Sequence, residues 1–86
     1  MTSTLPANRR EAEADHWDAG DMGCGPLVLE LRNRLRAMPG CVLKVTAYDA
    51  GAPVDLPAWC RMTKNELLRH DAANKCFWIK SRLNWG

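Results

Sequence analysis

The run PLVLELRNRLRAMPGCVLKVTAY, residues 26–48, decides the fold class because it changes midway from a helical pattern to a strand pattern. In its first half, apolar residues recur at steps of three and four, which predicts a helix with one apolar stripe. These residues are Leu27, Leu31, Leu35 and Met38. Pro26 suits the first turn of this helix, and Pro39-Gly40 ends it. From residue 41 to 48, apolar and polar residues alternate, which predicts a strand with one buried face.

Weaker signals on both sides extend this pattern. Residues 16–19 have the composition of a short strand, and a second amphipathic helix is predicted from Asp55, as its cap, to near His70. The turn DAANK then leads to a clear strand, CFWIKSRL, and residues 71–74 leave room for a short pairing strand before it. Strand, helix, strand, helix and one or two strands predict an α+β fold. The helices would form one layer on an antiparallel or mixed sheet.

The length and composition of the chain narrow the function classes. With 86 residues, we expect a flexible tail over residues 1–14 and a single domain over residues 15–86. A net charge of +2 gives no case for direct nucleic-acid binding. No apolar run approaches the roughly 20 residues that span a bilayer, and the first residues lack the apolar core of a signal peptide. We therefore expect a cytoplasmic protein without a membrane partner.

The four cysteines are the most informative residues of this composition. They permit three disulfide pairings, but a chain without a secretion signal favours reduced thiols. They lie far apart and form no CxxC pair, and this spacing argues against structural zinc. The question is then which of them carries chemistry.

Cys24 stands out because it lies between two glycines, in GDMGCGPLVLEL, just before the predicted helix. The first backbone N–H groups of a helix lack internal acceptors and carry partial positive charge, so they stabilise an anion. A thiolate there can have its pKa lowered from about 8.5 toward roughly 3.5–7.5. The glycines would let a partner approach the sulfur closely. The alternative is that Cys24 is a small buried residue at a loop–helix junction.

The positions of the other candidate residues in the sequence favour structural roles for most of them. Cys60 falls on the apolar stripe of the second helix, and Cys41 and Cys76 each open a strand, which is typical of packing residues. His16 and His70 have no ligand-like spacing, and surface or capping roles are expected for both. The tryptophans are expected to pack in the core or at its edge: Trp17, Trp59, Trp78 and Trp85. The arginines of the first helix form either a solvated face or a docking patch for an acidic partner: Arg32, Arg34 and Arg36.

Two motifs resemble those of TusA-like (SirA-like) sulfur carriers. In this family a strand ending in an apolar-Asp pair leads to a Cys-Pro-x-Pro motif at the first helix; Trp17-Asp18 matches the pair and Cys24 the cysteine. Residues 55–60, DLPAWC, match the family pattern Asp-Ile/Leu-Pro-x-aromatic-Cys at the second helix. The second motif is the more specific, and the resemblance spans about residues 16–82. The Cys-Pro-x-Pro motif is altered here to Cys24-Gly25-Pro26-Leu27.

The resemblance implies a two-layer β-α-β-α-β-β sandwich, with two helices on one face of a mixed four-stranded sheet. It also implies a sulfurtransferase or sulfur carrier that accepts sulfane sulfur as a persulfide on Cys24. The donor would be a cysteine desulfurase or rhodanese-type protein. The acceptor would serve tRNA thiolation, molybdenum-cofactor assembly or sulfur oxidation. No metal or organic cofactor is implied, and we expect a monomer.

Two other functions stay open at this point. The first is a non-catalytic interaction or regulatory module on the same fold, with Cys24 redox-sensing or incidental; the altered prolines favour it. The second is a thiol oxidoreductase that pairs Cys24 with another cysteine, and the missing CxxC argues against it.

Overall fold

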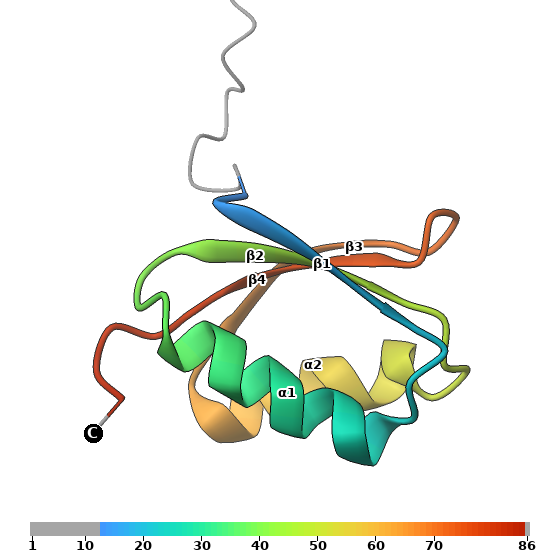
Figure 1. Cartoon of the computed structure of the whole chain (residues 1–86), viewed down its shortest axis with the longest axis horizontal. Helices are drawn as coiled ribbons and strands as arrows, with labels where there is room; N and C mark the ends of the chain where they lie inside the picture. Colours follow the sequence, from blue (N-terminus) through green and yellow to red (C-terminus); the bar gives the residue numbers. More distant parts are fainter. Residues whose placement is uncertain (1–12, 86) are drawn as a thin grey trace, which may run out of the picture.

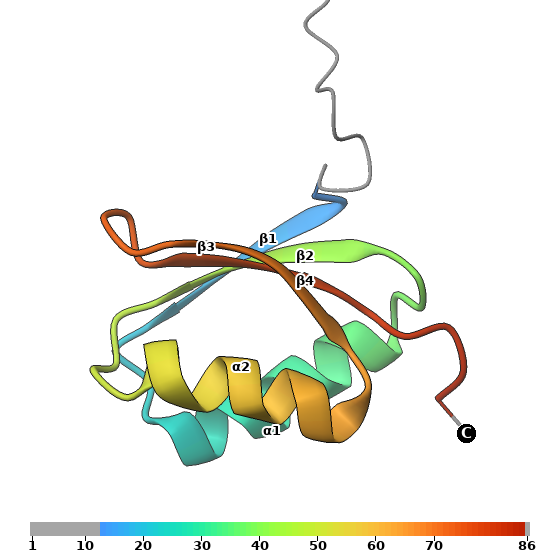
Figure 2. The same ribbon diagram turned by 180° about the vertical axis from the view of Figure 1, so that it is seen from behind.

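The computed structural model describes residues 13–85, and the chain there forms two helices and one mixed four-stranded sheet. The elements are β1 (Asp15–Gly20), α1 (Cys24–Arg36), β2 (Val42–Ala47), α2 (Ala52–Thr63), β3 (Glu66–Asp71) and β4 (Cys76–Lys80). The strand order is β1-β2-β4-β3; β1 runs parallel to β2, and the other neighbours are antiparallel. Both helices cover one face of the sheet (Figure 1; Figure 2, from behind). The predicted α+β sandwich is confirmed.

The core lies between the two helices and the inner face of the sheet. The predicted stripe of α1 is confirmed at its three leucines, positions 27, 31 and 35, which are fully buried; its fourth residue, Met38, lies beyond the end of the helix and is only partly buried. They meet the inward residues of the sheet and of α2: Leu43, Val45, Ala47, Phe77, Ile79, Ala52, Leu56 and Cys60. Removing this apolar surface from water is the main driving force for folding, so the core fixes how the two helix starts sit beside each other.

Helix α1 begins earlier than predicted. Gly23 is its N-cap in an extended conformation, and the Gly23 carbonyl accepts a hydrogen bond from Leu27 N at 2.9 Å. Pro26 is therefore the third helical residue, where its missing N–H would have no intrahelical partner anyway. The consequence matters for the site, because Cys24 is the first residue of the helix rather than part of the loop before it.

The predicted bounds of the second helix are wrong at both ends. Helix α2 starts at Ala52, so Asp55 lies in its first turn and does not cap it. It stops at Thr63 because Lys64 takes a left-handed conformation (φ 66°) and Asn65 N bonds back to the Cys60 carbonyl. Residues 66–71, predicted to continue the helix, instead form β3 against β4. The apolar spacing near residue 67 fits a helix as well as a strand, and pairing with the β4 backbone decides it.

The outer face of the sheet is covered in part by long polar side chains and is not fully exposed to solvent. Trp78 is only 8% exposed there, with Lys44 Nζ 5.2 Å and Arg69 Cζ 4.6 Å from its ring centroid. Its indole N–H donates to Glu13 at 3.1 Å, which lowers the pKa of that carboxyl. Ala14 N also donates to the Val42 carbonyl, at 2.7 Å. Residues 1–12 of the predicted tail lie outside the described residues.

Candidate functional site

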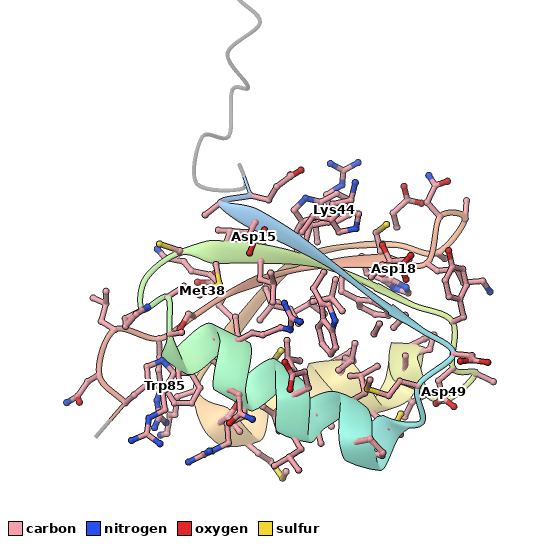
Figure 3. All side chains as sticks on the ribbon, viewed as in Figure 1. Asp15, Asp18, Met38, Lys44, Asp49 and Trp85 are labelled. Atoms are coloured by element: carbon pink, nitrogen blue, oxygen red, sulfur yellow. The ribbon has the colours of Figure 1, made fainter. Side chains whose placement is uncertain are left out.

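Sheet topology brings the loop before α1 and the loop before α2 together. Strands β1 and β2 are parallel neighbours, so their carboxyl ends lie at the same edge of the sheet. Gly20 takes a positive φ of 62° where the chain leaves β1, and its carbonyl accepts a hydrogen bond from Tyr48 N at 2.9 Å. Cys24 follows the first of these strands and Asp49 the second. Figure 3 labels Asp49 at this end of the molecule.

The Cys24 thiol contacts a carboxylate directly. Its Sγ donates a hydrogen bond to Oδ2 of Asp49 at 3.0 Å, and Gly51 N donates to the same oxygen at 3.0 Å. A methyl group on Gly51 would lie 3.1 Å from Oδ2 of both Asp49 and Asp55 and 3.7 Å from the Cys24 sulfur. One thiol and two carboxylates therefore converge around a glycine that leaves them room.

The predicted low pKa of Cys24 is wrong. The hydrogen bond to Asp49, with burial and the nearby Asp55 carboxylate, raises the pKa of Cys24 to about 12. A helix start stabilises an anion by only about 0.3–1 kcal/mol, less than one pKa unit. A carboxylate that accepts the thiol proton favours the neutral form, and two negative charges disfavour a third. At this helix start the carboxylates outweigh the helix dipole.

The alternative that Cys24 is a buried packing residue is also not what the structure shows. Its side chain is partly exposed and lies at the edge of a hollow of about 320 Å³ between the two helices, which we call the interhelix groove. Its lining is mainly apolar: Cys24, Gly25, Val28, Asp55, Ala58, Trp59 and Met62. Met62 is 75% exposed and Cys24 is partly exposed, so the groove is open to solvent.

The other cysteines are placed as the sequence predicted, with one exception. Cys60 lies in the core between helices and sheet, and Cys76 is buried on the outer sheet face. Cys41 is exposed, so it is a surface thiol rather than a packing residue. All four cysteines are free thiols. Within residues 13–85, no group of three His, Cys, Asp or Glu side chains is arranged to hold a metal ion.

The remaining candidates take structural contacts. His16 Nε2 lies 2.9 Å from Thr46 Oγ1, and the His70 ring stacks on Phe77 with centroids 4.2 Å apart. Arg34 pairs with Glu30 at 3.0 Å, and its guanidinium lies over the Trp17 ring. Neither histidine meets Cys24 in these contacts. No helix within residues 13–85 has the length and apolar character needed to cross a membrane.

Sequence reasoning missed the role of Asp49 and Asp55 at the thiol. Asp49 is 25 residues from Cys24 along the chain, and no local spacing joins them. The usable signal was topological: two parallel neighbouring strands place the residues that follow them at one sheet edge. Applied to the predicted strands ending near residues 19 and 48, this rule would have placed both loops together.

The sequence of the chain is similar to that of known sulfur carrier proteins. The chain is 32% identical over 68 residues to the sulfur carrier protein TusA of Pseudomonas paraeruginosa, an alignment that covers 76% of this chain and 86% of the relative. TusA of Pseudomonas aeruginosa matches with the same identity and the same coverage. No protein-family model matches the chain.

Proposed function

The chain belongs to the TusA family of sulfur carriers, and from this premise we propose that Cys24 accepts sulfane sulfur as a persulfide and passes it to an acceptor protein. The observation that best supports this role is the position of Cys24, partly exposed at the first turn of α1 and at the edge of the interhelix groove. A carrier needs an accessible sulfur and a surface that aligns the donor, and in this proposal the interhelix groove beside Cys24 would supply that surface.

The proposed transfer is a thiol exchange at sulfur. The Cys24 thiolate attacks the outer sulfur of a donor persulfide; the donor S–S bond breaks, and the donor thiolate leaves and takes up a proton. An acceptor thiolate later attacks the outer sulfur of the Cys24 persulfide and frees Cys24. We propose a cysteine desulfurase or rhodanese-type donor in a cytoplasmic relay that feeds tRNA thiolation, molybdenum-cofactor assembly or sulfur oxidation. In this proposal the carrier is a monomer that contacts neither nucleic acid nor membrane.

The direct test is the intact mass of the reduced protein after incubation with a persulfide-loaded desulfurase. We expect the gain of one sulfur atom, and complete loss of that gain in Cys24→Ser. Cys41→Ser is the matched control, because it removes an exposed thiol outside the groove and is expected to load normally. Unchanged loading of Cys24→Ser would contradict the proposal.

A second function is favoured by the carboxylates at the thiol. Asp49 and Asp55 keep Cys24 protonated, which suits a module that binds proteins without transferring sulfur. The same loading experiment separates the two functions. No sulfur adduct with any donor, together with equal partner binding by wild type and Cys24→Ser, would favour the binding module.

We also expect the interhelix groove to align the donor protein. Replacing Met62 by serine removes an exposed apolar side chain from the groove wall, and a lost contact of about 1 kcal/mol weakens binding about fivefold. The expected result is a KM for the loaded desulfurase raised about fivefold or more, with kcat unchanged. Val54→Ser is the matched control, because Val54 is 72% exposed on the same helix but does not line the groove. Equal KM values for the two variants would exclude this groove as the docking surface.

A further inference from the structure

The Asp49 carboxylate lies beside the thiol and is hydrogen-bonded to it. Its Oδ2 accepts hydrogen bonds from both Gly51 N and the Cys24 Sγ–H, each at 3.0 Å. The Gly51 amide belongs to the N-cap of α2, so the start of this helix fixes the carboxylate. The Gly51 amide therefore orients the Asp49 carboxylate toward the sulfur.

Asp55 adds a second carboxylate from the first turn of α2. The first turn of α1, which carries Cys24, holds no acidic residue of its own. Within residues 13–85 the one ion pair joins Arg34 and Glu30, so neither Asp49 nor Asp55 is paired with a cation of this part of the chain. The charged groups acting on the Cys24 sulfur are these two, which we call the carboxylate pair.

We propose that the carboxylate pair keeps Cys24 a protonated, unreactive thiol in the free carrier, and that a lysine or arginine beside the persulfide cysteine of the donor releases it. The inference rests on the function proposed above and names the chemistry of the partner that the site requires. A cation that contacts Asp49 and Asp55 compensates their charge, and a nearby positive charge favours the thiolate. Reactivity is then confined to the complex with a basic donor.

The atoms of the activated step balance without any further reagent. When the donor cation contacts the carboxylate pair, the Cys24 thiol releases its proton. The thiolate forms a bond to the outer donor sulfur, and the donor S–S bond breaks. The donor thiolate leaves with the bond electrons and takes up one proton. The sum is thiol plus persulfide giving persulfide plus thiol, with no net oxidation.

The first experiment measures Cys24 itself and does not depend on sulfur transfer. Iodoacetamide labelling of Cys24, located by peptide mass, is followed against pH in wild type, Asp49→Asn, Asp55→Asn and the double variant. Each pKa unit recovered raises the thiolate population tenfold but lowers its nucleophilicity, so the net gain is about threefold per unit. We expect about threefold to tenfold faster labelling at pH 8 in Asp49→Asn. The double variant should gain at least as much.

Asp15→Asn is the matched control. It makes the same change in charge at the start of β1, where Asp15 accepts a hydrogen bond from His16 N. Figure 3 labels Asp15 far from Asp49. Its labelling profile should match that of wild type. Asp55→Asn keeps the Asp49 bonds intact and serves if Asp49→Asn fails to fold. Labelling of the folded Asn variants within twofold of wild type at every pH would overturn the inference.

The second experiment tests the partner. Two persulfidated peptides are compared as donors, identical except that arginines or serines flank the cysteine. Wild type is expected to take sulfur about tenfold faster from the arginine peptide, and the double Asn variant should lose this preference. Equal rates in wild type, or a preference that survives in the double variant, would overturn the inference. Loading from neither peptide in any variant would instead overturn the carrier function, and the labelling profiles would still decide the effect of the carboxylate pair.

Discussion

Replacing Phe77 by alanine is expected to lower the free energy of unfolding by about 3–5 kcal/mol, the usual cost of removing a buried aromatic side chain. Phe77 is 1% exposed and lies on the inner face of β4, paired with Val45 of β2 and stacked against His70 of β3. It also lines a hollow of about 270 Å³ that Asp49 shares. The loss should appear in urea unfolding followed by tryptophan fluorescence.

Phe77→Leu is the control for this prediction. It keeps most of the apolar volume and should cost less than about 1.5 kcal/mol. A domain of this size has a small total stability, so the alanine variant is expected to be partly unfolded at 37 °C. If both variants lose the same free energy of unfolding, Phe77 would stabilise the fold by ring stacking on His70 rather than by filling apolar volume in the core. A loss below 1 kcal/mol for alanine would mean that the surrounding side chains close the cavity.

The sequence predicts the layers of this fold well because its periodicity reports burial. The stripe of α1 and the alternation of β2 each continue over several residues. The structure buries the three leucines of the stripe and the inward residues of β2: Leu43, Val45 and Ala47. The start of α2 was predicted wrongly because local signals compete there. Asp55-Leu56-Pro57 has the composition of a helix start, but the Asp49 and Gly51 carbonyls already accept the first helical hydrogen bonds, so the helix begins earlier. Likewise β3 depends on hydrogen bonds to β4, which no local pattern records.

The candidate site was predicted in part. A cysteine between glycines before a helix indicates where the sulfur lies, and Cys24 does open α1. Its acid–base behaviour was predicted with the wrong sign, because the helix dipole is a local property whereas Asp49 and Asp55 reach the thiol through tertiary structure. Two carboxylates distant along the chain outweigh one favourable local field.

The second large effect is expected at alkaline pH. The pKa of Cys60 is raised to about 12, chiefly by burial in the core. Below about pH 9 the thiol is protonated in both the folded and the unfolded chain, and the full stability is present. As the pH rises from 9 to 12, the unfolded chain releases a proton that the folded chain retains, so unfolding becomes easier. For Cys60 alone the loss reaches about 4 kcal/mol near pH 12.

The free energy of unfolding of wild type and Cys60→Ala, measured in urea with a reductant between pH 7 and 11, tests this effect. At pH 7 the alanine variant should be less stable, because the sulfur leaves a small cavity. The difference in the free energy of unfolding between wild type and Cys60→Ala should shrink steadily above pH 9, because the variant lacks the thiol that titrates. All other groups are the same in the two proteins, so their contributions cancel in the difference. Parallel pH profiles would contradict the prediction.

Cys24 should add a second loss of stability at alkaline pH, with a different physical cause. Its pKa is raised to about 12 first by the hydrogen bond to Asp49, then by burial and by the Asp55 carboxylate, so Cys24→Ala should likewise flatten the profile above pH 9. Salt separates the two thiols, because added ions screen partly exposed charges but leave the burial of Cys60 unchanged. In high salt, the contribution of Cys24 should therefore shrink while that of Cys60 persists. An equal response of both to salt would mean that burial and the hydrogen bond to Asp49, rather than the charges of the carboxylate pair, hold the proton on Cys24.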